Sequence, residues 1–204
     1  ASSRPGSARQ AGTCGCTVLS RSHQRRAGAS PDRTVAASRW PASRLPRRAC
    51  VGVGLAAAGA VPVVLGGDHS VNIPCINAFS DEEPFHLVQI DAHLDFVDER
   101  HGVKYGHGNP MRRAAEKPNV TGLSQVGIRN VSSTAKDGYD DARKMGSDIQ
   151  SVRQFRKLGV AGMLDRIPAD GRYYVTIDID GFDPSVAPGT GTPSHGGFFY
   201  SEIL

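Results

Sequence analysis

Short apolar runs alternate with helical patterns along the chain from residue 60 to its end. The runs are rich in β-branched and aromatic residues, which favours strands, and they stop at glycine or at charged residues. The segments between them have the composition or the 3.6-residue period of helices. This pattern predicts strands at 60–67, 85–91, 123–129, 148–152 and 172–180, and helices at 69–79, 109–116, 137–145 and 153–167.

This alternation predicts an α/β fold in three layers, with a mainly parallel sheet between two layers of helices. Ligands of such sheets bind at the carboxyl ends of the strands. We therefore expect the chemistry of the protein to follow the apolar runs. No apolar run reaches the roughly 20 residues of a membrane-spanning helix, and we expect no membrane partner.

Acidic residues and histidines follow three of the predicted strands. A single Asp in such a place is more often a helix cap or a surface group, but three clusters at one sheet edge would repel one another unless cations neutralise them. Alternate residues of an extended strand point to the same side, so the members of each cluster can converge. The candidate metal ligands are His69, Asp91, His93, Asp95, Asp178 and Asp180.

The composition of this ligand set indicates the kind of metal. Carboxylates with one or two imidazoles and no thiolate suit manganese or magnesium better than structural zinc. Six ligands with carboxylates able to bridge suit two ions, and such a pair lowers the pKa of a shared water towards neutrality. We therefore expect a binuclear site, with two Mn²⁺ as the favoured cofactor.

Three motifs together resemble the ureohydrolase family, which includes arginase and agmatinase. They are "GGDHS" from residue 66, "DAHLD" from residue 91 and "IDIDGFDPSVAPGTGTPSHGG" from residue 177, and the resemblance covers residues 59–204. It implies a fold with helices on both sides of a parallel sheet and two Mn²⁺ ions. It also implies hydrolysis of a guanidinium compound to urea and an amine by a metal-bound hydroxide.

The resemblance assigns roles to individual residues. One ion would be held by His69, Asp91, Asp95 and Asp178, and the other by Asp91, His93, Asp178 and Asp180, with Asp91 and Asp178 bridging. His107 would shuttle a proton to the leaving amine and, with Asp95, is a catalytic candidate. His101 is an alternative to His107, and either could be a loop histidine without a catalytic role. Asn130 is a candidate for substrate binding, Asp183 for orienting the glycine-rich loop or a ligand histidine, and His195 for a structural role.

The loop between Asp95 and His107 resembles the agmatinase and guanidinobutyrase branch, so an agmatine-like substrate is expected. Asp98 and Glu99 would meet a cationic amine or would be solvated. The family domain is longer at both ends, which implies a fragment without the carboxylate that pairs with the substrate guanidinium. A non-catalytic metal-binding remnant and an arginase or guanidinobutyrase specificity are the alternatives. The full-length family implies a homo-oligomer.

The charge of the chain is unevenly distributed. Residues 1–50 contain ten arginines and one acidic residue, or +9, so the net charge of +4 leaves −5 for the rest, which gives no indication of nucleic-acid binding. We predict a disordered tail at 1–48 and a partial metal-binding domain at 49–204. The tail has the composition of a transit peptide, a basic arm or a sequence foreign to the domain. A cytoplasmic protein is expected, or a mitochondrial one if the tail is a transit peptide.

Overall fold

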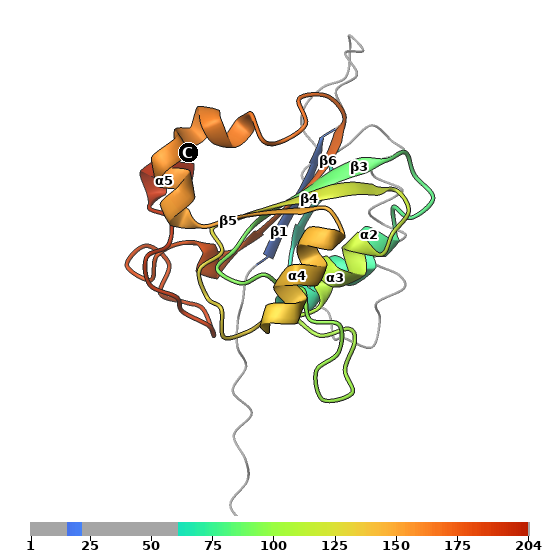
Figure 1. Cartoon of the computed structure of the whole chain (residues 1–204), viewed down its shortest axis with the longest axis horizontal. Coiled ribbons are helices and arrows are strands. Elements are labelled where there is room, and N and C mark those ends of the chain that lie inside the picture. The colour runs from blue at the N-terminus through green and yellow to red at the C-terminus, as the bar shows by residue number, and fades with distance from the viewer. Residues whose placement is uncertain (1–15, 22–60, 204) are drawn as a thin grey trace, which may run out of the picture.

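The structure, a computed structural model, describes residues 16–21 and 61–203 (Figure 1). The described residues form a six-stranded sheet in the order β2-β1-β6-β3-β4-β5. The strands are β1 (Cys16–Arg21), β2 (Val63–Leu65), β3 (Phe85–Ile90), β4 (Val120–Val126), β5 (Ser147–Gln150) and β6 (Arg172–Asp178). The α-helices are α2 (Asn72–Asn77), α3 (Pro110–Ala115), α4 (Lys136–Lys144), α5 (Val152–Leu164) and α6 (Tyr200–Ile203), and two 3₁₀ helices are η2 (His69–Val71) and η3 (Ile179–Gly181).

The centre of the sheet is parallel, as the alternation of strands and helices predicted. β3 pairs in parallel with both β4 and β6, and β4 pairs in parallel with β5. The predicted strand at 123–129 ends earlier, at Val126, because Gly127 has a φ of 98°. A side chain at Gly127 would meet the Asp91 carbonyl at 2.8 Å, so this glycine lets two strand ends approach closely.

Strand β1 lies within the segment predicted as a tail. Its six residues lie between β2 and β6 and pair with both in the antiparallel sense. The segment contains Thr17 and Val18, β-branched residues that favour strands. The rest of the tail, and residues 49–60 of the predicted domain, lie outside the described residues.

Helices pack on both faces of the sheet. Phe85 and Leu87 of β3 belong to the main core, which they share with residues of α2, α3 and α4. Ile90, on the opposite face of the same strand, packs against a second cluster that includes Met163 of α5 and Phe198. This arrangement confirms the α/β architecture.

Helix α5 is only partly amphipathic, contrary to the prediction for residues 153–167. It begins after Ser151, whose side chain and that of Gln154 form a capping box. Gly159 interrupts it with φ 72° and ψ 175°, which changes the direction of the second half. Leu158 and Val160, on either side of this break, are exposed, whereas Met163 is buried.

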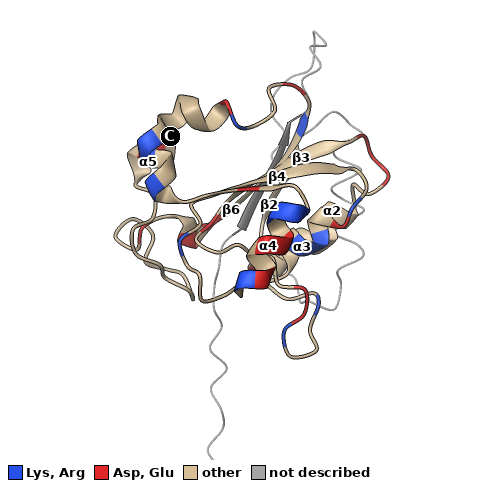
Figure 2. Cartoon of the chain, viewed as in Figure 1, with Lys and Arg blue, Asp and Glu red and all other residues tan. Residues whose placement is uncertain are grey.

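Helix α3 carries two arginines, whereas α4 carries both basic and acidic residues (Figure 2). Arg112 of α3 lies 3.2 Å from Asp141 of α4, and Lys136 pairs with Asp140 within α4. Among the described helices, none has the length and apolar character needed to cross a bilayer.

Candidate metal centre

Three strand ends meet at one edge of the sheet. Ile90 of β3 is paired with Ile177 of β6, so the next residues, Asp91 and Asp178, leave neighbouring parallel strands at the same level. A Cβ on Gly181 would lie 3.1 Å from the Asp91 nitrogen, so the two chain segments are in close contact beyond the strands. His69 reaches the same place from η2, directly after β2.

The segment from Asp91 to Asp95 is not an extension of β3. The strand stops at Ile90, and Asp95 has a left-handed φ of 52°, so the expected alternation of an extended strand is absent. The turn directs the Asp95 carbonyl to the nitrogen of Met111 at 3.1 Å, at the start of α3. The side chains of Asp91 and His93 still converge on the centre, but by a turn and not by strand geometry.

The structure brings the predicted ligands into two groups. Ligand atoms of His69, Asp91 and Asp178 lie within 4.8 Å of one another, and so do those of Asp91, His93 and Asp180. All five residues are buried. Asp91 belongs to both groups, as a bridging carboxylate should, whereas Asp178 belongs only to the first. Asp95 lies outside both groups and bonds to His69.

The ring of His69 is held from both sides. Its Nε2 lies 3.1 Å from the hydroxyl of Thr176, and its Nδ1 lies 3.2 Å from Asp91 Oδ2 and 3.8 Å from Asp178 Oδ2. Thr176 precedes Asp178 by two residues on β6 and thus projects from the same face. The threonine therefore leaves Nδ1 of His69 directed at the carboxylates, in the position of a metal ligand.

The pKa values of Asp91, His93 and Asp180 are shifted by burial and by their neighbours in the centre. Burial raises the pKa of Asp91 well above its ordinary value, and the charge of Asp95 adds to this effect. Burial alone would lower the pKa of His93, but hydrogen bonds to Asp180 and Asp91 raise it to about 10. Burial opposes ionisation of Asp180, yet bonds from His93 and Thr192 hold its pKa at about 2. Carboxylates that require protons or a cationic imidazole beside them fit divalent cations.

The glycine-rich loop after η3 contributes contacts that the sequence did not reveal. The hydroxyl of Thr192 donates to Asp180 Oδ2 at 2.7 Å. Asp183 accepts hydrogen bonds from Ser185 and from the nitrogen of Gly196, which confirms its predicted role in orienting the loop. The loop therefore supports one ligand directly and is itself held in place by an aspartate outside the centre.

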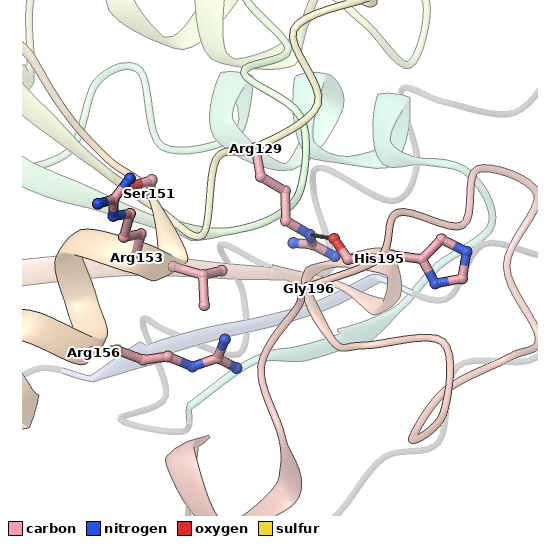
Figure 3. A pocket seen from close by; sticks show the side chains of 7 residues that line it. Arg129, Ser151, Arg153, Arg156, His195 and Gly196 are labelled. Carbon is pink, nitrogen blue, oxygen red and sulfur yellow. Dashed lines mark hydrogen bonds between the residues drawn. The ribbon is translucent and has the colours of Figure 1, made fainter.

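Arg129, immediately after β4, connects this loop to the sheet. Its guanidinium donates to Asp180 O and Ser194 O, both at 2.6 Å. It also donates to His195 O at 3.0 Å (Figure 3). Further bonds reach the carbonyls of Gly127, Gly181 and Phe182. Arg129 also lines a pocket with Arg153 and Arg156 of α5. No residue-type pattern could reveal this role, because every acceptor is a backbone carbonyl.

The part of the chain that carries the centre is similar to known proteins. The model of the arginase family matches residues 42–204, which include all the predicted ligands. The chain belongs to the arginase family. It is 41% identical to a guanidinopropionase of Pseudomonas aeruginosa over 69% of this chain and 46% of that protein. It is 36% identical to the mitochondrial agmatinase of Gallus gallus over 74% of this chain and 46% of that protein.

Solved structures of arginase-family proteins have the same fold. Proclavaminate amidinohydrolase of Streptomyces clavuligerus matches with a TM-score of 0.62 and 35% identity, over 68% of this chain and 48% of that chain. Agmatine ureohydrolase of Thermoplasma volcanium matches with a TM-score of 0.67 and 27% identity, over 78% and 53% respectively. The chain spans about half the length of the curated relatives it matches.

The remaining predicted site residues lie outside the two ligand groups. His107 is exposed on the loop between β3 and α3. Its neighbour Asn109 makes no capping hydrogen bond to α3 through its side chain. Its amide instead accepts from Gly106 N at 2.9 Å and donates to Val97 O at 2.6 Å, which closes the loop. His101, the alternative to His107, has a φ of 52° in the same loop.

Two other candidates are already engaged by protein groups. Asn130 donates to Ser194 at 2.9 Å and accepts from Ser132, so its side chain supports the loops. Asp98 bonds to Arg113. A role of either side chain in binding substrate would require it to exchange or share these partners. His195 contributes its carbonyl to Arg129, while its ring points away from Arg129 (Figure 3).

Proposed function

We propose that this arginase-family chain carries a two-manganese centre that hydrolyses a guanidinium compound, agmatine-like, to urea and an amine. The observation that carries the proposal is the pair of buried ligand groups that share Asp91. His69 and Asp178 complete the first group, and His93 and Asp180 complete the second. Oxygen-rich donors with imidazoles and no thiolate favour Mn²⁺ among divalent ions.

Two divalent ions, when bound, supply Lewis acidity and a nucleophile derived from water near neutral pH. The protein's own residues do the rest. Asp91 and Asp178 would offset the charge of bound cations, and the carboxylate of Asp95 bonds to His69 of the first group. His107 is exposed on the adjacent loop, where it can exchange protons with solvent, which supports a role in protonating the leaving amine.

The choice of substrate depends on groups farther from the metals. Relatives of the chain are named for guanidinopropionate, agmatine, guanidinobutyrate and arginine chemistry. Their common element is the guanidinium, and they differ in the far end of the substrate. The loop from Val97 to Gly108 lies beside the centre in sequence and supports an agmatine-like preference by its resemblance to that branch.

The experiment is urea release from agmatine, arginine, guanidinobutyrate and guanidinopropionate, with Mn²⁺ present and after its removal. Agmatine is expected to give the highest kcat/KM, and an Asp180→Asn variant should release no urea. A chain that binds Mn²⁺ but hydrolyses none of the four would be a metal-binding module without turnover. A preference for guanidinopropionate would contradict the agmatine-like assignment while leaving the reaction class intact.

A further inference from the structure

Two buried glutamines lie directly beneath the centre. Gln89 of β3 and Gln125 of β4 are register partners in the sheet, and neither has any exposed surface. Both amides are fully buried, so each has to find its hydrogen-bond partners inside the protein. Gln89 bonds directly to Asp91, the residue that belongs to both ligand groups, and Gln125 bonds to Gln89.

The backbone determines the orientation of the first amide. Gln125 Nε2 donates to the carbonyl of Leu94 at 2.7 Å and to Gln89 Oε1 at 2.6 Å. A rotated Gln125 amide would place its oxygen against the Leu94 carbonyl, which can only accept. The carbonyl of Leu94 therefore selects the orientation in which Gln125 presents an N–H to Gln89.

The second amide passes this orientation to Asp91. Because Gln89 Oε1 faces Gln125, the Nε2 of Gln89 faces the centre. This nitrogen donates to Asp91 Oδ2 at 2.6 Å and to His93 O at 3.2 Å. The other carboxylate oxygen, Asp91 Oδ1, accepts from His93 N at 2.6 Å. Each oxygen of Asp91 thus receives one N–H and keeps lone-pair capacity for a cation.

The resulting orientation assigns one oxygen of Asp91 to each ligand group. Oδ2 lies 3.2 Å from His69 Nδ1, in the first group, and Oδ1 lies 3.5 Å from His93 Nδ1, in the second. Rotation of the carboxylate would remove one oxygen or both from these positions. A bridging ligand therefore depends on the two N–H groups that fix its plane.

We propose that Gln125 and Gln89 form an amide relay that orients Asp91 as the bridge between two divalent cations. The relay rests on the proposed metal centre, and both glutamines are positioning residues, since neither contacts a cation position. Groups that orient ligands in this way typically change metal affinity by about 10- to 100-fold when they are replaced.

The test is the binding of Mn²⁺ to Gln89→Met, Gln125→Met and the double variant, measured by equilibrium dialysis. Exchange coupling between the two ions, measured by electron paramagnetic resonance, reports whether a bridge joins them. Each single variant should weaken Mn²⁺ binding by about tenfold or more and reduce the coupling. The double variant should bind no more weakly than Gln89→Met, because Gln125 acts only through Gln89.

Gln150→Met is the matched control. Gln150 is buried on β5 and donates to Asp148 at 2.5 Å, away from the ligands. Its replacement should change the melting temperature of the metal-free chain without changing Mn²⁺ affinity. If the Met variants do not fold, Gln125→Asn keeps an amide that is too short to reach Gln89 and should give the same loss of affinity.

Two results would overturn the relay. One is Mn²⁺ binding by a folded Gln125 variant that is as tight and as strongly coupled as in the unsubstituted chain. The other is a loss in the double variant equal to the product of the single losses, which would show independent effects. Failure of the unsubstituted chain to bind Mn²⁺ is a different outcome, because it would overturn the metal centre itself and the relay with it.

Discussion

The guanidinium of Arg129 donates to the backbone carbonyl of Asp180 at 2.6 Å and thereby joins two strand ends that do not pair with each other. Arg129 follows β4 and Asp180 follows β6, while β3 lies between these strands. The side chain of Arg129 therefore fixes the backbone of Asp180 across the end of β3. The chain after β3 carries two other candidate ligands, Asp91 and His93.

Replacement of Arg129 by Ala should destabilise the metal-free chain by about 3 kcal/mol, because several carbonyls lose a charged donor and only some regain water. Denaturant unfolding measures this change. Arg153→Ala is the control: Arg153 lines the same pocket, is exposed, and has no hydrogen bond or ion pair within the described part of the chain. It should change stability by less than about 0.5 kcal/mol. Equal effects of the two substitutions would contradict the role of Arg129.

Mn²⁺ should stabilise the chain against heat, since the cations bind the folded ligand groups and relieve repulsion among their carboxylates. At 100 times the dissociation constant the gain is about 2.7 kcal/mol, and a chelator should reverse it. Differential scanning fluorimetry with and without Mn²⁺ provides the measurement. Asp180→Asn should abolish most of this gain, whereas Asp98→Asn, outside both groups, should retain it. An identical response in both variants would argue against the assigned ligands.

Replacement of Asn109 by Ala should destabilise the chain by about 2 kcal/mol, because this buried amide bonds to both ends of the loop that carries His107. The loop should also be cleaved faster in limited proteolysis. Asn77→Ala, at an exposed position near the end of α2, is the control and should leave both quantities nearly unchanged. Unchanged cleavage of the loop in Asn109→Ala would show that other contacts suffice.

Asp183 should make stability depend on acid pH. Hydrogen bonds from Ser185 and Gly196 hold its pKa at about 2, below the unfolded value of about 3.9. A lowered folded pKa contributes stability above pH 4, and this contribution is lost as the pH falls from about 4 to about 2. The difference in unfolding free energy between the chain and Asp183→Ala, measured without metal, should therefore shrink over this range. A difference that stays constant down to pH 2.5 would contradict this linkage.

The sequence was sufficient for the strands between residues 61 and 180 and for the three clusters at their ends. Asp91 and Asp178 follow apolar runs, and parallel pairing then brings them together. The position of Thr176 beside the centre could also be predicted, because it lies two residues before Asp178 on a predicted strand. These features depend on residue type and spacing, which a sequence displays directly.

Other features depend on backbone geometry that a sequence does not display. The acceptors of Arg129 are main-chain carbonyls, and the relay through Gln125 begins at another carbonyl. The extended path expected for Asp91 to Asp95 is replaced by a left-handed turn at a residue that is not glycine. The break in α5 was signalled by Gly159, but a glycine within an amphipathic pattern does not by itself specify where a helix changes direction.

At Asp95 the backbone conformation favours glycine, whereas the contact with the metal centre requires a carboxylate. A left-handed φ of 52° is costly for a residue with a side chain, and glycine would adopt it with less strain. The Asp95 carbonyl would still reach α3 after such a substitution, but the bond of its carboxylate to His69 would be lost. Directed evolution that rewards only thermal tolerance should therefore accumulate Asp95→Gly, and selection that also requires turnover should reject it.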